Sequence, residues 1–530
     1  MGFMGETTVR IVFCLLICAF FSVAGCGGTV DKEITVRPTE DGETPVEGAN
    51  GGGSDIRPVP RKFVERPPDL AHGSGNTVTP KVGVRPLDVA PEAIGPAKPR
   101  ILHQPPDADP DSVEPYSSKE PIAIRRVDPE TGAHLVQVFY ATDRSPIVDE
   151  ADQIDINVFL LPLAAGIVTV LFGLATIFWS RRIVLSLLTL VSLLVTLGLA
   201  HSANLKYQKQ KRLVESGNRV YSSERHLAGT EAVLELGVCE ISVPPDHRVG
   251  KVESPSIIRL EFQEDPKKHV VLQQVTLRKE RAFYEDLKTC VAGSNRKQAF
   301  VFIHGYNVSF DGAVKRTAQI AHDLKFDGAP ICYSWPSLGG LTDYSRDESN
   351  VTWTVTRLES FLKRVVDDSG ATSVHLIAHS MGNRALVQTL ERMALSQTSP
   401  GPVFGQVIMA APDVDANEFH GRYASSITRM ARHVTLYASS NDRALVASTK
   451  VHGHNRAGLS GEHMVVVAGV DTVDVSPIDT SLIGHSYYGD NPTMIKDLQV
   501  LVELGKPAAD REWLERIARS PSLAYWVFRQ

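Results

Sequence analysis

Residues 374–386 read VHLIAHSMGNRAL, and this stretch decides the fold. Residues 374–378 form an apolar run typical of a buried parallel strand, and residues 383–393 carry apolar side chains at helical spacing. Ser380 therefore falls in the turn between a strand and a helix. The turn is either an ordinary connection or a nucleophile elbow, which exposes a serine hydroxyl above the carboxyl edge of a sheet. The strict elbow pattern is Gly-x-Ser-x-Gly, and here Ala378 stands in the first glycine position.

The surrounding sequence alternates short apolar runs with amphipathic segments, which indicates a mostly parallel α/β sheet flanked by helices. We expect this domain to occupy residues 215–504, with a first strand at 136–146 and a C-terminal helix or tail at 505–530. The other strands are predicted at residues 299–304, 329–335, 373–379, 405–412, 433–439 and 464–470.

Two further residues complete a possible catalytic triad with Ser380. In an α/β hydrolase the triad follows the chain order serine, acid, histidine, each on a loop after a strand. Asp442 comes just after the predicted strand 433–439, and His485 follows the next predicted strand. Asp442 could instead cap the following helix, and His485 could be one surface histidine among 17. Asp413 is the alternative acid, because it follows the preceding strand.

These residue types suit acyl transfer. A serine hydroxyl becomes nucleophilic when an imidazole accepts its proton, and a carboxylate holds that imidazole in the required tautomer. His485 is therefore the predicted base and Asp442 its orienting acid. The oxyanion of the tetrahedral intermediate needs two amide donors, and we expect them from Met381, after the nucleophile, and Tyr306, in the loop after residues 299–304.

Several stretches together resemble a known family: FVFIHGYNVSFDGAVKRTAQIAHDL, APICYSWPSLG, VHLIAHSMGNRAL and GHSYYG. They are similar to those of a bacterial α/β-hydrolase family, esterase/lipase-like and largely of unknown function, from about Phe139 to Leu504. In that family alanine before His-Ser-Met-Gly is ordinary, which accounts for Ala378. The resemblance implies an α/β-hydrolase fold and a triad, and it implies no substrate.

The N-terminal part of the chain predicts export. An apolar run follows Arg10 and ends at Val23-Ala24-Gly25-Cys26, which resembles the bacterial lipobox. We expect residues 1–26 to be a lipoprotein-type signal peptide with Cys26 lipidated; a plain secretory signal or an uncleaved anchor is the alternative. Residues 27–135 hold 17 of the 32 prolines and few apolar residues, so we predict a disordered tether.

Residues 157–200 are the most apolar part of the chain. The runs 157–179 and 183–200 flank Arg181 and Arg182, and each is close to the ~20 residues that cross a bilayer. We expect a two-helix transmembrane hairpin, inserted in the catalytic domain after its first strand; two buried core helices are the alternative. The positive charges between the two runs and those after the second run predict opposite orientations of the hairpin in the membrane. A lipidated Cys26 favours a catalytic domain on the periplasmic side of the inner membrane, in the cell envelope.

Composition excludes other classes of function. The net charge of -6 offers no basic surface for nucleic acid. Cys239, Cys290 and Cys332 are too widely spaced for a disulfide framework or a metal cluster. His452 and His454 lack an accompanying metal-binding motif. We therefore expect no metal and no cofactor.

The leading hypothesis is a membrane-anchored serine hydrolase that cleaves a small-molecule or lipid ester through an acyl-enzyme. One alternative is a non-catalytic envelope protein that keeps the hydrolase fold for binding or scaffolding. Another is an acyltransferase that uses the same triad with an acceptor other than water. Protein partners are not predicted.

Overall fold

The computed structural model describes residues 124–147, 157–178, 182–215, 217–256, 259, 261, 263–338, 343–398, 401–478 and 487–529. They all belong to one compact unit, Asp107–Gln530. The predicted signal peptide with Cys26, the tether up to residue 123 and the proposed base His485 lie outside the described residues.

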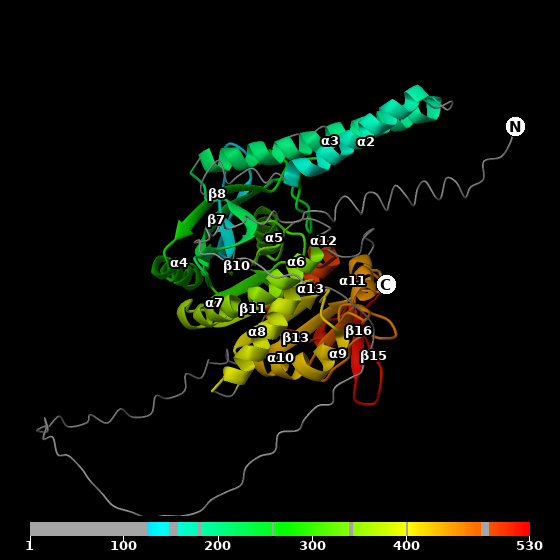
Figure 1. The fold of residues 1–530 in the computed structure, drawn as a ribbon. Coiled ribbons are helices and arrows are strands. Elements are labelled where there is room, and N and C mark those ends of the chain that lie inside the picture. Colours follow the sequence, from blue (N-terminus) through cyan, green and yellow to red (C-terminus); the bar gives the residue numbers. More distant parts are fainter. Residues whose placement is uncertain are drawn as a thin grey trace, which may run out of the picture. The chain divides into compact units, whose positions relative to one another are not determined.

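A 12-stranded mixed sheet organises this unit (Figure 1). Its centre is a run of parallel strands, because each connection crosses over through helices. In spatial order, the parallel strands are β2 His134–Thr142, β10 Gly328–Ser334, β9 Gln298–Ile303, β11 Ser373–His379, β12 Phe404–Ala410, β13 Ala431–Ala438, β14 Asp471–Asp474 and β16 Ala524–Phe528.

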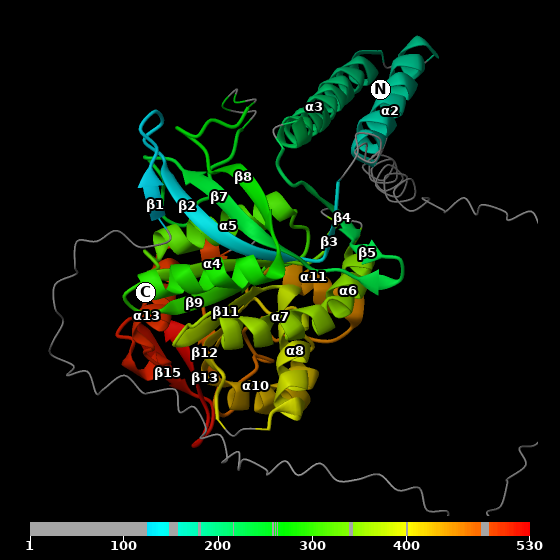
Figure 2. The same cartoon turned by 90° about the vertical axis from the view of Figure 1, so that its left-hand side faces the viewer.

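Antiparallel strands close both ends of the sheet. Figure 2 shows β2, β7 and β8 side by side at one end. These outer strands are β1 Ile124–Val127, β7 Glu235–Val243, β8 Val271–Arg278 and β15 Leu514–Ala518, and two small sheets pair β3 Arg144–Pro146 with β4 Tyr221–Arg225 and β5 Leu227–Ala228 with β6 Glu231–Ala232.

Helices cover both faces of the sheet, so its central strands are apolar on both sides. In β9, Val301 and Ile303 face one hydrophobic core, and Phe300 and Phe302 face the other. The first core contains side chains of α4 Glu280–Gly293, α7 Val355–Asp368, α8 Gly382–Ser396 and α10 Ala424–Met430, and the second those of α5 Phe310–Asp323 and α13 Pro492–Leu504.

Shorter helices connect these layers. They are α6 Tyr344–Trp353, α9 Ala416–Glu418, the π-helix Phe419–Tyr423, α11 Arg443–His452, α12 Tyr487–Asp490 and the 3-10 helix Ala508–Asp510. A mostly parallel, mixed sheet with helices on both faces fits an α/β-hydrolase fold, as the sequence predicts.

Three predicted elements differ from the structure. Residues 464–470 form no strand: Met464, Val465 and Val466 are buried in the first core, but the pairing segment is β14, directly after them. Residues 505–530 contain β15 and β16 instead of a helix, because the aromatic and β-branched run AYWVF pairs with β14. The predicted tether is also too long, because residues 124–135 already include β1 and the start of β2.

The predicted hairpin is present as two long helices, α2 Asn157–Phe178 and α3 Arg182–Glu215. They contact one another where Thr169 Oγ1 lies within hydrogen-bond distance of the hydroxyls of Ser192 (2.8 Å) and Thr196 (3.1 Å). A search of the described residues finds no helix with the length and hydropathy required to cross a membrane.

The helix pair is an insertion within the α/β unit. β2 lies before it and β7 after it, and the two strands pair antiparallel from His134–Val243 to Thr142–Glu235. As expected from the sequence, both flanks of the insertion therefore enter the same sheet.

Candidate active site

Ser380 occupies a strained turn at the carboxyl end of β11. Its φ of +51° is a left-handed conformation that non-glycine residues rarely adopt. Gly382, at the start of α8, packs so closely on the backbone of His304 that a β-carbon there would collide with the His304 carbonyl oxygen. A strained serine between a parallel strand and a helix is the geometry of a nucleophile elbow.

Neighbouring segments hold this turn in place. The Ser380 amide donates to the Ala410 carbonyl (3.0 Å), and the Asp413 amide donates to the Ser380 carbonyl (3.2 Å). The Asn383 side-chain amide lies 3.2 Å from the carbonyl oxygens of Ala378, Ser380 and Ala410. These bonds tie the elbow to the end of β12, and they offset the cost of its backbone strain.

The elbow lies where the strand order of the sheet reverses. From β9 the chain crosses to β10 on one side and later to β11 on the other. In open α/β sheets, ligands bind in the crevice at such a point, beside the carboxyl ends of the strands. The loop after β9 enters this crevice: a β-carbon on Gly305 would lie 2.9 Å from Ser380 Cβ and 2.8 Å from His379 Nδ1. The backbone next to Tyr306 therefore runs against the elbow, and Met381 is buried beside it.

His304 anchors that loop from within the protein. Its Nδ1 donates to the Gly305 carbonyl (2.8 Å), its own carbonyl accepts from Trp335 Nε1 (2.7 Å), and its ring stacks on the Trp335 ring. Burial, together with the nearby Arg144 guanidinium, lowers the pKa of His304 to about 3. The imidazole is therefore neutral at physiological pH, and its Nε2 faces Arg144 Nη2 at 3.3 Å.

Arg144, a residue that sequence reasoning missed, joins the loops around the site. It is fully buried at the start of β3, and it donates to the Val308 carbonyl (2.7 Å) and the Ser337 carbonyl (3.0 Å). Burial lowers the pKa of Arg144 to about 10, so the guanidinium stays charged at neutral pH. The only sequence signal was its place near the end of the first predicted strand, 136–146.

Asp442, the predicted acid of the triad, lies between β13 and α11. It is fully buried, and its Oδ1 accepts a hydrogen bond from the Leu445 amide (3.0 Å) as the N-cap of α11. The neighbouring Asn441 donates from Nδ2 to the Ser476 carbonyl (3.0 Å), in the loop after β14. Asp442 thus caps α11, and the residue before it contacts the loop that follows β14.

Asp413, the alternative acid, is enclosed in a separate polar network. Its Oδ2 accepts from the Tyr344 hydroxyl (2.6 Å) and from Arg384 Nη2 (3.0 Å). Its Oδ1 accepts from the Ser448 hydroxyl (2.6 Å), and Arg456 Nε lies 3.5 Å from it. With both oxygens engaged, Asp413 acts as a structural link between α8, α6 and α11.

The described residues on either side of the segment that carries His485 contact the rest of the unit. On its near side, the Ile478 carbonyl accepts from Asn491 Nδ2 (2.7 Å). On its far side, the Tyr488 ring stacks on His379, the residue before Ser380, with ring centroids 4.3 Å apart. Tyr488 therefore brings the described chain after this segment into contact with the elbow.

A second group of titratable side chains lies elsewhere. Within the described residues, His247, His322 and Asp323 form a cluster that could hold a metal ion. Sequence reasoning missed it because its members come from segments 75 residues apart that carry no shared motif.

The fold and the strained serine define a class of protein, the α/β-hydrolase fold with a nucleophile elbow. Comparisons with known proteins agree with this class. Residues 279–503 match the model of a family described as "Alpha/beta hydrolase of unknown function (DUF900)". The chain is also 21% identical over 266 residues to the "Uncharacterized protein alr1448" of Nostoc sp., covering 38% of this chain and 69% of that protein. These relatives support the fold and name no substrate.

Proposed function

We propose that this protein is a serine hydrolase that cleaves an ester or related acyl bond, with Ser380 as nucleophile, His485 as base and Asp442 as orienting acid. The observation that carries the proposal is the left-handed backbone of Ser380 at the end of β11, with the Gly305 backbone packed against it. A rare, strained conformation persists only where the surrounding structure enforces it, and such strain gathers at active sites.

In the proposed reaction, His485 removes the proton from the Ser380 hydroxyl as its oxygen attacks the acyl carbon. The amides of Tyr306 and Met381 donate to the oxyanion of the tetrahedral intermediate. His485 then gives its proton to the leaving alcohol, and an acyl-enzyme forms. A water molecule, activated by the same histidine, releases the acid and restores Ser380.

The contacts of the two candidate acids favour Asp442. Both carboxylate oxygens of Asp413 accept hydrogen bonds from side chains of the polar network, so Asp413 is committed to that network. Asp442 follows β13, and its loop is bonded to the loop after β14. The acid of an α/β hydrolase must reach the histidine that follows the next strand, and the contact between these two loops supports Asp442 as that acid.

Hydrolysis of p-nitrophenyl esters of graded acyl length tests the proposal. The wild-type protein should turn over at least one ester, and Ser380→Ala and His485→Ala should each lower kcat on the order of 10⁶-fold, because triad members act as a unit. Circular dichroism would establish that both variants remain folded. Undiminished turnover in Ser380→Ala would reject the mechanism. An increase in ester product when an alcohol is added would instead favour the acyltransferase alternative.

We also propose that the catalytic domain is held at the periplasmic side of the inner membrane by a lipid on Cys26 and by the apolar hairpin of residues 157–200. The described side chains of α2 and α3 support the hairpin, because many large apolar ones are exposed. A large exposed apolar surface of this kind is unfavourable in water, and it marks a region that contacts lipid or another protein. Exposed by half or more are Leu163, Ile167, Val170, Leu171, Leu174, Leu187, Leu190, Val191, Leu194, Val195 and Leu197. A substrate at that surface would be a lipid or a small-molecule ester.

A further inference from the structure

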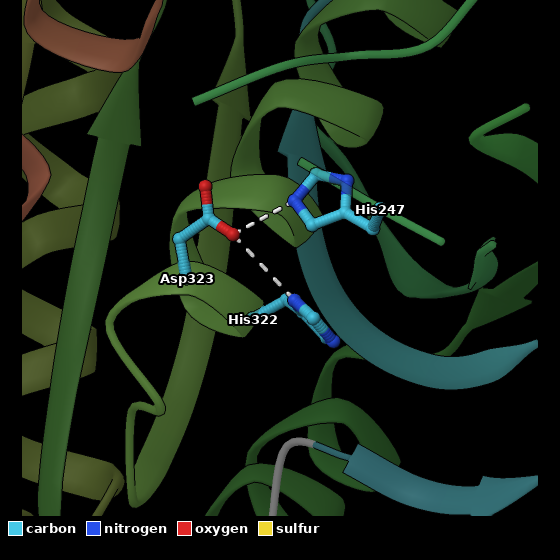
Figure 3. A group of neighbouring side chains, drawn as sticks. All are labelled: His247, His322 and Asp323. Atoms are coloured by element: carbon cyan, nitrogen blue, oxygen red, sulfur yellow. Dashed lines mark hydrogen bonds and ion pairs between the residues drawn. The ribbon is translucent and has the colours of Figure 1, made fainter. Parts of the chain in front are cut away.

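A cluster of histidines and carboxylates lies at the opposite edge of the sheet from Ser380. His322 and Asp323 end α5, and His247 lies in the loop after β7 (Figure 3). His134, which begins β2, contacts His322. β2 and β11 run in the same direction, so the amino end of β2 and the carboxyl end of β11 are at opposite edges. Strands of seven to nine residues separate the two places by about 25 Å. The cluster is therefore no part of the proposed hydrolytic site.

We propose that His247, His322 and Asp323 form a binding site for a divalent transition-metal ion of the Zn²⁺ type. The three atoms that would coordinate it are His247 Nε2, His322 Nδ1 and Asp323 Oδ1, all within 4.8 Å of one another. Figure 3 shows both imidazoles directed at the same carboxylate oxygen. Two imidazole nitrogens and one carboxylate oxygen are a common ligand set for zinc, with water in the fourth position.

The spacing of these atoms suits such an ion. Asp323 Oδ1 lies 2.8 Å from His247 Nε2 and 3.6 Å from His322 Nδ1. Tetrahedral ligands at zinc bond lengths of about 2.0–2.1 Å are roughly 3.3–3.5 Å apart. The distances from Asp323 Oδ1 to the two imidazole nitrogens therefore differ from this spacing by about 0.7 Å or less. The side chains of His247 and Asp323 are almost fully buried, and that of His322 is mostly so.

The remaining polar atoms of each ligand already have other partners. His247 Nδ1 donates to Glu253 Oε2 (2.9 Å), which leaves Nε2 for the metal. Asp323 Oδ2 accepts from the Gly250 amide (2.6 Å) and from Gln319 Nε2 (2.6 Å), which leaves Oδ1. Metal-binding histidines characteristically donate their second nitrogen to a carboxylate, because this fixes the tautomer and makes the ligand more basic.

His322 supplies an independent observation. Its Nε2 is 2.8 Å from His134 Nδ1, and its buried Nδ1 has no hydrogen-bond partner among the described residues. At 3.6 Å, that nitrogen is too far from Asp323 Oδ1 for a hydrogen bond. A buried imidazole nitrogen left without a partner is costly, and a cation between it and the carboxylate would satisfy both.

The alternative is a metal-free ion-pair cluster. Burial opposes the charged form of His247, but hydrogen bonds to Asp323 and Glu253 outweigh that effect and raise its pKa to about 9. A proton on Nε2 of His247 would then take the place of the metal in the bond to Asp323. In this alternative His322 Nδ1 faces Asp323 Oδ1 only across 3.6 Å, without a hydrogen bond, whereas a metal ion between the two atoms would bind both.

Zinc titration of the full-length protein in detergent distinguishes the two. The protein is purified without a polyhistidine tag, stripped with a chelator and titrated with Zn²⁺ against a chromophoric competitor. We expect one tightly bound equivalent, and at least about 100-fold weaker binding in Asp323→Asn and His322→Gln. Glu253→Gln should weaken binding by about 10–100-fold, because Glu253 orients a ligand without being one. His420→Gln, at an exposed histidine outside the cluster, should bind as the wild type does.

Two further measurements keep this test decisive. Co²⁺ in place of Zn²⁺ should give the visible absorption of a tetrahedral site in the wild type and in His420→Gln. Phosphonate labelling of Ser380 and circular dichroism should remain normal in all cluster variants, which separates metal loss from unfolding. Absence of a bound equivalent in the wild type, or unchanged affinity in folded Asp323→Asn and His322→Gln, would overturn the proposal in favour of the ion-pair cluster.

Discussion

At the scale of single residues, the two carboxylates near Ser380 have different surroundings and should respond differently to the same substitution. Asp442→Asn keeps a good helix cap but cannot hold the imidazole in the required tautomer, so kcat should fall on the order of 10⁴-fold with little loss of stability.

Asp413→Asn disturbs a buried network that includes Arg384 and Tyr344, and it should cost about 3–5 kcal/mol of stability while kcat stays within about tenfold. Steady-state kinetics and thermal melts of both variants check this, and a crippled but stable Asp413→Asn would move the acid to that position.

The roles of these residues can be predicted from the sequence to different degrees. Ser380 was predictable because its turn is local: an apolar run, a small-x-Ser-x-Gly pattern and a helix are contiguous. Asp442 was predictable as a residue after a strand. The role of Asp413 was not, since its partners Tyr344, Ser448 and Arg456 come from other elements. Arg144 was missed for a related reason: a charged residue is rarely buried without a partner, and its partners are backbone carbonyls that no pattern marks.

At the scale of elements, the loop between β9 and α5 depends on a neutral, buried His304. The groups around it are the Arg144 guanidinium, the Ser334 hydroxyl and the Trp335 ring. The folded-state pKa of about 3 is below the unfolded value of about 6.5, so the unfolded chain binds more protons between these pH values. The stability that the neutral imidazole provides is therefore present above pH ~6.5 and lost as the pH falls towards 3.

His304→Gln should reveal this linkage. It keeps an acceptor for Arg144, removes the titrating group, and should reduce the pH dependence of the unfolding free energy by up to about 1.4 kcal/mol per pH unit between pH 6 and 4. Urea denaturation at stepped pH measures the slope. His375, whose pKa burial lowers to about 4, is present in both proteins and cancels. Equal slopes for the two proteins would mean that His304 does not titrate on unfolding.

The elements themselves were predictable where they are apolar and flanked by helices, as β9 to β13 are. An apolar run indicates that a segment is buried, however, and does not show that it pairs with another strand. Residues 464–470 are apolar because they cover the core, whereas the strand β14 is the polar-looking DTVD, stabilised by pairing on both sides. The register of β14 with β16 depends on chain that lies 50 residues further on, and no local pattern contains that contact.

At the scale of the whole molecule, the pairing of β2 with β7 constrains topology. Both ends of the inserted helix pair return to one sheet, so a membrane-inserted hairpin must place both flanks on the same side. Reporter fusions after Gly95 and after Gln530 should both give periplasmic signals, and Cys26→Ala should alter processing of the N-terminus. A cytoplasmic signal from the C-terminal fusion would reverse the proposed orientation, and unaltered processing would remove the lipid from it.

Covalent labelling with a serine-reactive fluorophosphonate tests the central claim most directly, because it needs no knowledge of the substrate. An activated serine in an elbow, beside its base and its oxyanion donors, reacts with the phosphorus, whereas an ordinary serine does not. The account predicts one adduct per chain, mapped by peptide mass spectrometry to Ser380, absent in Ser380→Ala and strongly slowed in His485→Ala. No adduct on the folded wild-type protein, or an adduct that persists in Ser380→Ala, would contradict it.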